Sequence, residues 1–283
     1  MSTTTWKPNV WVAVVLGIVV QPFAFLYLNK PKLFWIYFLI SILLAIASFN
    51  LGGNADVILA IIYISICIVQ IIISSKKINL ENSRKWYSRW WGVSTSSLAF
   101  IAIIFLFRSF LYDTVNFQSS SMRPFLNPGH VLIVKKYGYG GYGTFGIRLG
   151  HGGISNDIKL ERGNIYAFYR PNKTVIYVKR LIGMPGDHIV VKGYDISING
   201  VLLKTSLLSD DSEFQLYNEK IDHKSYQTLR KKVDSYLKDE DIVVPDGSYF
   251  FLGDNRGFSA DSRIWGFIPG SDFVGEVVYV FGE

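Results

Sequence analysis

Three short segments in the second half of the chain carry residue types that could perform acyl chemistry. Asn116–Pro124 ends a run of three serines at Ser121, Tyr177–Asp187 contains Lys179, and Gly253–Gly266 is rich in Asp, Asn, Arg and Ser. A serine hydroxyl becomes a nucleophile only when a base takes its proton. Lysine can be that base only when it is neutral, so its pKa must fall well below the ordinary value of about 10.4.

Taken one at a time, these segments are ordinary. A serine triplet is typical of a polar linker, a lysine on a strand is usually exposed, and an Asp- and Arg-rich turn usually carries surface ion pairs. A Ser-His-Asp arrangement must also be weighed. The chain has four histidines, at His130, His151, His188 and His223. None of them sits in a recognisable motif, and a strand-edge position is the simplest interpretation of His130.

In this order, the three segments resemble the conserved boxes of bacterial type I signal peptidase. That family (leader peptidase, Ser-Lys peptidase family S26) is a membrane-bound endopeptidase that removes signal peptides from exported proteins. The boxes are Ser-x-Ser-Met-x-Pro at 119–124, Lys-Arg-x-x-Gly-x-Pro-Gly-Asp at 179–187, and Gly-Asp-Asn-Arg followed by Ser-x-Asp-Ser-Arg-x-Trp-Gly at 253–266. The resemblance covers residues 117–283 and leaves out the first ninety or so.

The resemblance implies a role for each matching residue. Ser121 would be the nucleophile and Lys179 the general base, while the Ser119 hydroxyl and the Ser121 N–H would form the oxyanion hole. Supporting roles fall on the third box: Ser259 would hold the lysine amine, Asp261 would pair with Arg263, and Gly253 and Asp254 would shape the loop. The substrate pocket wall would include Phe117, Leu126 and Val178.

The substrates implied are preproteins whose signal peptides end in a small-x-small segment, recognised by strand addition beside the catalytic groove. Two alternatives remain: a Ser-Lys peptidase dedicated to a pilus or conjugation substrate, and a catalytically silent membrane scaffold. We expect neither a metal nor an organic cofactor, since the sequence has no His/Cys cluster and no phosphate-binding glycine loop. The single cysteine, Cys67, excludes an intramolecular disulfide.

Composition indicates that these segments are attached to a membrane. Of the 283 residues, 49% are hydrophobic and 16% aromatic, and only 18% are charged, which is unusual for a soluble chain. The net charge is +7, but nine basic and only three acidic residues precede residue 118, while the remainder is nearly balanced. A basic surplus beside apolar segments is typical of membrane topology rather than of nucleic-acid binding.

Four apolar segments predict about four spans within residues 1–116: Trp11–Leu28, Phe34–Phe49, Ala55–Ser74 and Leu98–Leu111. Gln21-Pro22 interrupts the first and Phe34–Phe49 is short, so a re-entrant or tilted pair is the alternative for these two segments. Basic residues gather between the first two segments and between the last two, so those loops are predicted to be cytoplasmic. Residues after Leu111 would then face the periplasmic or extracytoplasmic side of a bacterial inner (cytoplasmic) membrane. The N-terminus lacks the features of a cleavable signal peptide.

The predicted fold is a membrane protein with N-terminal α-helical transmembrane segments and a mainly antiparallel all-β catalytic domain at 117–283. Short runs rich in Val, Ile, Tyr and Phe predict the strands: His130–Lys136, Asn164–Arg170, Val175–Ile182, His188–Lys192, Ile196–Leu203, Tyr249–Leu252 and Val274–Phe281. Glycine-dense Tyr137–Gly153 is predicted to be a flexible loop. Charged Ser209–Asp241 is predicted to be an insertion, helical around Tyr226–Leu237.

Overall fold

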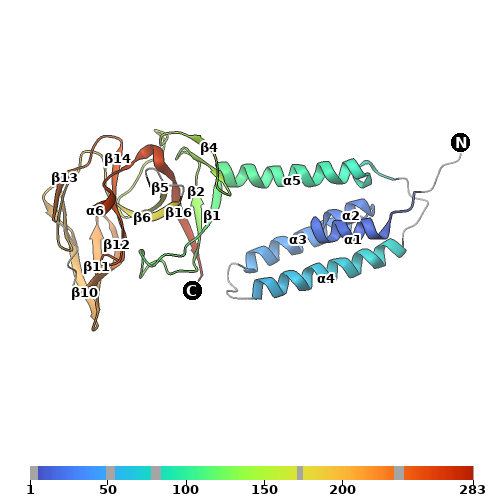
Figure 1. The fold of residues 1–283 in the computed structure, drawn as a ribbon, viewed down its shortest axis with the longest axis horizontal. Helices are drawn as coiled ribbons and strands as arrows, with labels where there is room; N and C mark the ends of the chain where they lie inside the picture. The colour runs from blue at the N-terminus through green and yellow to red at the C-terminus, as the bar shows by residue number, and fades with distance from the viewer. Residues whose placement is uncertain (1–5, 49–54, 78–83, 171–174, 233–238, 283) are drawn as a thin grey trace. The chain divides into compact units, whose positions relative to one another are not determined.

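The computed structural model describes residues 6–48, 55–77, 84–170, 175–232 and 239–282. The chain forms two compact units: residues 1–105, with the last two residues, and residues 106–281. The first is helical and the second is built almost entirely of strands (Figure 1). This confirms the predicted combination of apolar helices and an antiparallel β domain.

The helical unit contains three helices that are long and apolar enough to cross a bilayer, counted over the residues described. They are α3 (Pro31–Ser48), α4 (Ala55–Lys76) and α5 (Trp90–Phe110). The first predicted span differs, because it folds as two short helices, α1 (Val10–Val19) and α2 (Phe23–Tyr27). Gln21 adopts a positive φ of 35° next to Pro22, and proline removes the backbone donor that a continuous helix needs. Neither piece alone is long enough to cross.

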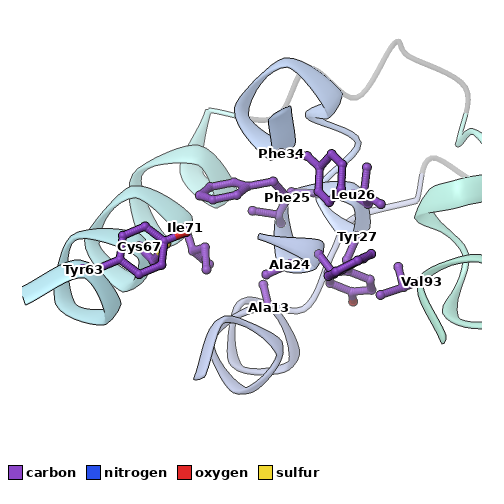
Figure 2. Packing of buried hydrophobic residues seen from close by; sticks show 12 residues of the cluster. Ala13, Ala24, Phe25, Leu26, Tyr27, Phe34, Tyr63, Cys67, Ile71 and Val93 are labelled. Carbon is purple, nitrogen blue, oxygen red and sulfur yellow. The ribbon is translucent and has the colours of Figure 1, made fainter. Parts of the chain in front are cut away.

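A cluster of buried side chains holds these helices together (Figure 2). Gly17 of α1 lies so close to α4 that an added Cβ would stand 2.3 Å from Ile71 Cδ1. The α2 residues Phe23 to Tyr27 are all buried, and the Tyr63 hydroxyl of α4 donates to the Tyr37 carbonyl of α3 at 2.7 Å. The outward faces of α3, α4 and α5 carry many exposed apolar side chains, as expected for helices in lipid.

A seven-stranded antiparallel sheet forms the centre of the second unit, in the order β1-β2-β16-β5-β6-β14-β15. Its strands are β1 (Tyr112–Asn116), β2 (Val131–Lys135), β5 (Ile165–Tyr169), β6 (Ile176–Gly183), β14 (Ser248–Leu252), β15 (Ile268–Pro269) and β16 (Phe273–Phe281). The predicted strands within this sheet are confirmed. Strand β1 pairs with β2 along its whole length, so the β unit begins before the predicted boundary at residue 117.

Two smaller sheets complete most of this unit. One contains β7 (His188–Lys192), β8 (Asp195–Ile198), β9 (Val201–Leu202) and β13 (Glu240–Val243), and the other contains β10 (Lys204–Asp210), β11 (Phe214–Ile221) and β12 (Lys224–Lys231). The helix predicted around Tyr226–Leu237 is therefore wrong as far as Lys231, and residues 233–238 lie outside the described ranges. In β12 the side chains of Tyr226, Thr228 and Arg230 are buried at alternate positions, and this period of two is that of a strand.

The predicted flexible loop at Tyr137–Gly153 is also wrong. It contains a hairpin of β3 (Gly141–Thr144) and β4 (Ile147–His151). Several of its glycines allow backbones to meet closely rather than to move. An added Cβ on Gly141 would stand 2.2 Å from the Phe273 carbonyl oxygen, and one on Gly140 would stand 2.2 Å from that of Gly152.

Candidate active site

Ser121 and Lys179 are in direct contact. Ser121 lies in a turn after β1, and Lys179 lies in the middle of β6, where it is paired with Tyr166 of β5. The distance between Lys179 Nζ and Ser121 Oγ is 2.5 Å. Ser121 is 6% exposed and Lys179 is 3% exposed. The structure therefore brings together the two residues that the sequence predicts as nucleophile and base.

The surroundings of Lys179 favour its neutral form. Burial lowers the pKa of this lysine to about 8, although the carboxylates of Asp261 and Asp254 oppose the shift and Arg263 adds to it. Desolvation penalises an isolated ammonium because the interior replaces its water shell poorly. A minor fraction of Lys179 is consequently neutral near pH 7, rising to half near pH 8, and in that form its lone pair can accept the proton of Ser121 Oγ.

Ser119 lies beside the Ser121 hydroxyl, as predicted for an oxyanion-hole donor. Its Oγ donates to Ser121 Oγ at 3.1 Å and accepts the backbone N–H of Ser121 at 3.2 Å. Both predicted oxyanion donors, the Ser119 hydroxyl and the Ser121 N–H, therefore lie beside Ser121 Oγ. The Ser121 N–H donates to the Ser119 hydroxyl, which in turn donates to Ser121 Oγ. A developing oxyanion would have to replace these contacts by accepting from both donors.

The loop that begins at Gly253 is held by a buried ion pair. Asp261 caps the short helix α6 (Ser262–Trp265), accepts the Gly253 N–H at 3.0 Å and pairs with Arg263 at 2.8 Å. Burial raises the pKa of Asp261, but the Arg263 charge and these hydrogen bonds outweigh it, so the net shift is downward. Asp261 thus stays ionised and is paired with Arg263, as predicted.

The same loop is tied to the serine segment and to β6. The Asn255 N–H donates to the Ser121 carbonyl at 3.1 Å, and the Asn255 side chain donates to the Ser120 carbonyl at 3.1 Å. Asp254 makes a two-contact ion pair with Arg180, at 2.7 and 2.5 Å. The Arg180 guanidinium is therefore paired with Asp254, and the amine of the neighbouring Lys179 is the group that contacts Ser121 Oγ. The link through Asn255 was not predicted, although Asn255 belongs to the third sequence box.

A second unpredicted support comes from the insertion. Glu219 of β11 is buried and accepts from Arg256 at 2.5 Å and from the Tyr226 hydroxyl at 2.6 Å. The Arg256 guanidinium also donates to the Gly253 carbonyl at 3.2 Å. The insertion therefore contacts the loop that surrounds the Ser-Lys pair. A lone glutamate in a charged segment gives no sequence signal for such a contact, because most glutamates are exposed.

A groove of about 510 Å³ opens onto Ser121 and Lys179. One wall is the end of β1 and the segment up to Ser121, the other is Val175–Lys179, and Phe258 and Ala260 complete it. Phe117 and Val178 line the groove as predicted. Leu126 does not line it, because its side chain is fully buried in the core behind Phe117 and Val178. Its helical turn after the serine segment directs it inward.

Ser259 and the described histidines make no hydrogen bond to Ser121 Oγ or to the Lys179 amine within the residues described. Within the described residues, no hydrogen bond joins Ser259 Oγ to the Lys179 amine, so Ser259 does not hold that amine here. His130 is buried and its Nδ1 accepts the Asn127 N–H, His188 pairs with exposed Asp241, and His223 is exposed. None of these three side chains bonds the Ser121 hydroxyl, and the His151 side chain lies outside the description.

The described ranges contain no cluster of three metal-ligating side chains.

Comparison with known proteins identifies relatives of this chain. The family model described as signal peptidase, peptidase S26, matches residues 90–281. A signal peptidase I from Buchnera aphidicola subsp. Baizongia pistaciae is 30% identical over 259 residues, which cover 72% of this chain and 81% of that protein. One from Pseudomonas aeruginosa is 31% identical, covering 63% and 68%. A signal peptidase IB from Staphylococcus aureus is 32% identical, covering 68% and 87%.

Proposed function

The chain belongs to the signal peptidase family, peptidase S26, and is a serine peptidase; we propose that it cleaves signal peptides from exported proteins with a Ser121-Lys179 dyad. The single observation that carries the dyad is the 2.5 Å contact between the buried Lys179 amine and Ser121 Oγ. Family membership and the three apolar helices associate the protein with the inner membrane and with preprotein substrates.

The proposed reaction begins with neutral Lys179. Its amine takes the proton of Ser121 Oγ, which attacks the carbonyl carbon of the scissile peptide bond and gives a tetrahedral intermediate. The Ser119 hydroxyl and the Ser121 N–H donate to the oxyanion. Protonated Lys179 then gives its proton to the leaving amine as the C–N bond breaks. A water molecule, deprotonated by the same lysine, hydrolyses the acyl-enzyme and restores Ser121.

The groove supports the proposed choice of an extended peptide with small side chains. Strand β6 pairs with β5 along Ile176–Arg180, but with β14 only from Arg180 onward. The other edge of Ile176–Lys179 is unpaired within the described residues, so a substrate strand could add there with backbone hydrogen bonds. Phe117, Val178 and Phe258 narrow the walls, which would favour Ala or Gly at the first and third positions before the cut.

We further propose that the β unit lies on the extracytoplasmic side of the membrane. The support is the basic surplus in the loops between the apolar segments. A signal peptide crossing the bilayer would present its cleavage segment on that side. Tethering the enzyme to the same membrane raises its local concentration near the substrate and offsets weak contacts to any one sequence.

A preprotein cleavage assay tests this function. The purified full chain in detergent is incubated with a general secretory preprotein that has Ala at both small positions, and the new N-terminus is read by mass spectrometry. We expect a cut directly after the small-x-small segment, no cut by Ser121→Ala, and no cut when Leu or Trp replaces either Ala. Equal rates for Ala and Leu substrates would contradict the small-residue groove.

The same assay distinguishes the proposed function from its main alternative. An enzyme dedicated to a pilus or conjugation substrate would ignore general secretory precursors and process one genetically linked partner. A silent scaffold would cut neither. Retention of Ser121 and Lys179 in hydrogen-bond contact favours an active enzyme over the scaffold.

A further inference from the structure

Phe258 is a half-exposed aromatic side chain in the catalytic groove. It is 50% exposed, it lies in the loop of the third sequence box, and it lines the groove beside Ala260. Two residues of the insertion contact it. The Phe214 ring of β11 lies 5.9 Å away between ring centroids, and Lys231 Nζ of β12 lies 4.9 Å from the Phe258 ring centroid. The insertion therefore reaches the groove through this side chain.

Backbone hydrogen bonds join the loop of the third box to β12. The Leu229 N–H donates to the Asp254 carbonyl at 2.9 Å, and the Arg256 N–H donates to the Leu229 carbonyl at 2.8 Å. Gly257 lies against the strand, since an added Cβ there would stand 2.7 Å from Lys231 Cβ. The position of Lys231 beside the groove is therefore set by the packing of the strand on the loop.

Lys231 is a cation whose amine forms no ion pair among the residues that the structure describes. The neighbouring Lys232, in contrast, pairs with Asp210 at 2.5 Å, and Asp211 accepts the backbone N–H groups of its own turn. The described lining of the groove contains no aspartate or glutamate. An aromatic ring attracts an ammonium but accepts none of its three N–H groups as a carboxylate would. The positive charge of Lys231 is therefore available to an acidic group in the groove.

Strand pairing shows on which side of the cut the third-box loop lies. The edge of β6 at Ile176–Lys179 is free within the described ranges, but from Arg180 onward β14 occupies that edge, and the third-box loop follows the end of β14. The cut falls beside Lys179, whose amine contacts the nucleophile, and the proposed pocket for residues before the cut includes Val178. Those residues therefore run back along the free edge. The third-box loop bounds the groove at the cut and lies across the path of the residues after it.

We propose that Phe258 and Lys231 form a subsite for the first few residues after the cut, and that this subsite favours acidic side chains. It rests on the proposed function, since it concerns the same groove and the same preproteins. The Phe258 ring supplies an apolar surface for the extended chain, and the Lys231 amine supplies positive charge beside it. A carboxylate on the substrate pairs with that amine, whereas a substrate lysine is repelled by it. The insertion thereby selects among preproteins by the start of the mature chain.

Matched preproteins test the subsite. They share one signal peptide with Ala at the first and third positions before the cut, and they carry Glu, Gln or Lys at each of the second, third and fourth residues after it. The value of kcat/KM is measured in detergent at low salt for the full chain and for Lys231→Met, Lys231→Arg and Lys231→Glu, with folding checked by Tm. Binding is measured separately as the Kd of each fluorescently labelled preprotein for the Ser121→Ala chain, with and without Lys231→Met.

Lys135→Met is the matched control. Lys135 also lies on a strand of the β unit, and its Nζ is 4.4 Å from the centroid of an aromatic ring, that of Tyr137. Neither residue lines the groove. Loss of a lysine from an aromatic face is therefore the same in both variants, and only the distance from the groove differs.

We expect the Glu preprotein to be cleaved about 3- to 10-fold more efficiently than the Lys preprotein, with Gln between them and a smaller difference at high salt. Lys231→Arg and Lys135→Met should keep this ratio, Lys231→Met should bring it close to one, and Lys231→Glu should reverse it. Equal values for the three preproteins, or an unchanged ratio in Lys231→Met, would overturn the subsite.

The binding measurement separates this inference from the proposed function. Cleavage of all three preproteins with equal kcat/KM and equal Kd contradicts the subsite alone. Tighter binding of the Glu preprotein that is lost in Lys231→Met, without cleavage by the native chain, supports the subsite and contradicts the proposed function.

Discussion

Lys179 illustrates how surroundings convert an ordinary side chain into a candidate base. In water its amine would be almost fully protonated at neutral pH. Its burial on β6 lowers the pKa to about 8, and the pairing of Asp261 with Arg263 limits the opposing effect of that carboxylate. Arginine could not replace it, because a guanidinium stays protonated and has no lone pair to accept a proton.

The pH dependence of cleavage follows from this lowered pKa. Only the neutral amine acts as base, so kcat/KM should rise with pH and level off above an apparent pKa of about 8. The measurement is the initial rate of preprotein cleavage between pH 6 and 10 at low substrate concentration. A rate that is independent of pH across 7–9, with the enzyme still folded, would contradict a lysine base.

Stability should change in the opposite direction to activity when the lysine is removed. The folded-state pKa lies below the unfolded value of 10.5, so the unfolded chain binds the proton more tightly and burial of the charged lysine destabilises the fold below pH 8. Lys179→Met should therefore raise the free energy of unfolding at pH 7, by up to about 3 kcal/mol. The gain should shrink as the pH rises from 8 to 10.5.

Thermal unfolding in detergent at pH 7 and pH 10 measures this difference. The control is Lys192→Met, which removes an exposed lysine at the end of β7 and should change Tm little at either pH. A lower Tm for Lys179→Met than for the native chain at pH 7 would contradict the destabilising burial.

At the scale of elements, the third box acts as a loop that closes on the serine segment from one side. The Asn255 N–H reaches the Ser121 carbonyl, and Gly253 lies against the same carbonyl and against Ser259. An added Cβ on Gly253 would stand 2.5 Å from Ser121 O and 2.1 Å from Ser259 Oγ. The close packing of this loop explains why the box contains glycine there.

Gly253→Ala should displace this loop. Overpacking of this kind costs about 1–3 kcal/mol, and it should lower the cleavage rate more than the loss of stability explains, because the displaced groups contact Ser121. Gly153→Ala is the matched control, since nothing lies within 4 Å of its added Cβ. Tm and cleavage rate are measured for both. Native activity in Gly253→Ala would show that the loop does not position Ser121.

Strands were predicted correctly from the sequence where residue types that favour strands are also buried in the structure. Strands such as β2, β5 and β16 are rich in Val, Ile, Tyr and Phe and form the central sheet. The β3–β4 hairpin was missed because its glycines are needed for close backbone contacts, which local patterns do not reveal. Strand β12 was mistaken for helix because the positions that alternate with its buried residues include Gln227 and Lys231, residue types that also favour helices.

Part of the candidate site was also predicted from the sequence. Ser121, Lys179, Asp261 and Arg263 lie in the three boxes and meet in the structure. Leu126 was placed on the groove wall from its position in the first box, but the turn after Ser121 buries it. Glu219 could not be predicted, because its contact with Arg256 depends on how the insertion packs on a loop 37 residues further along the chain.

At the scale of the whole molecule, the charge distribution predicts which side of the membrane the β unit faces. In a Cys67→Ala background, single cysteines are placed at Asn82, in the basic sequence segment before α5 and outside the described residues, and at Asp246, an exposed position before β14. An impermeant maleimide applied to intact spheroplasts should label position 246 and should reach position 82 only after lysis. Labelling of both positions from outside would overturn the orientation.

The most direct test of the account is the cleavage rate of Lys179→Met beside that of His130→Ala, on the same preprotein and with folding checked by Tm. The account predicts that Lys179→Met loses activity by about 10²- to 10⁴-fold, that adding Ser121→Ala lowers it little further because the two residues act as one unit, and that His130→Ala keeps most activity. Substantial activity in Lys179→Met, or its loss in a folded His130→Ala, would contradict the Ser-Lys dyad.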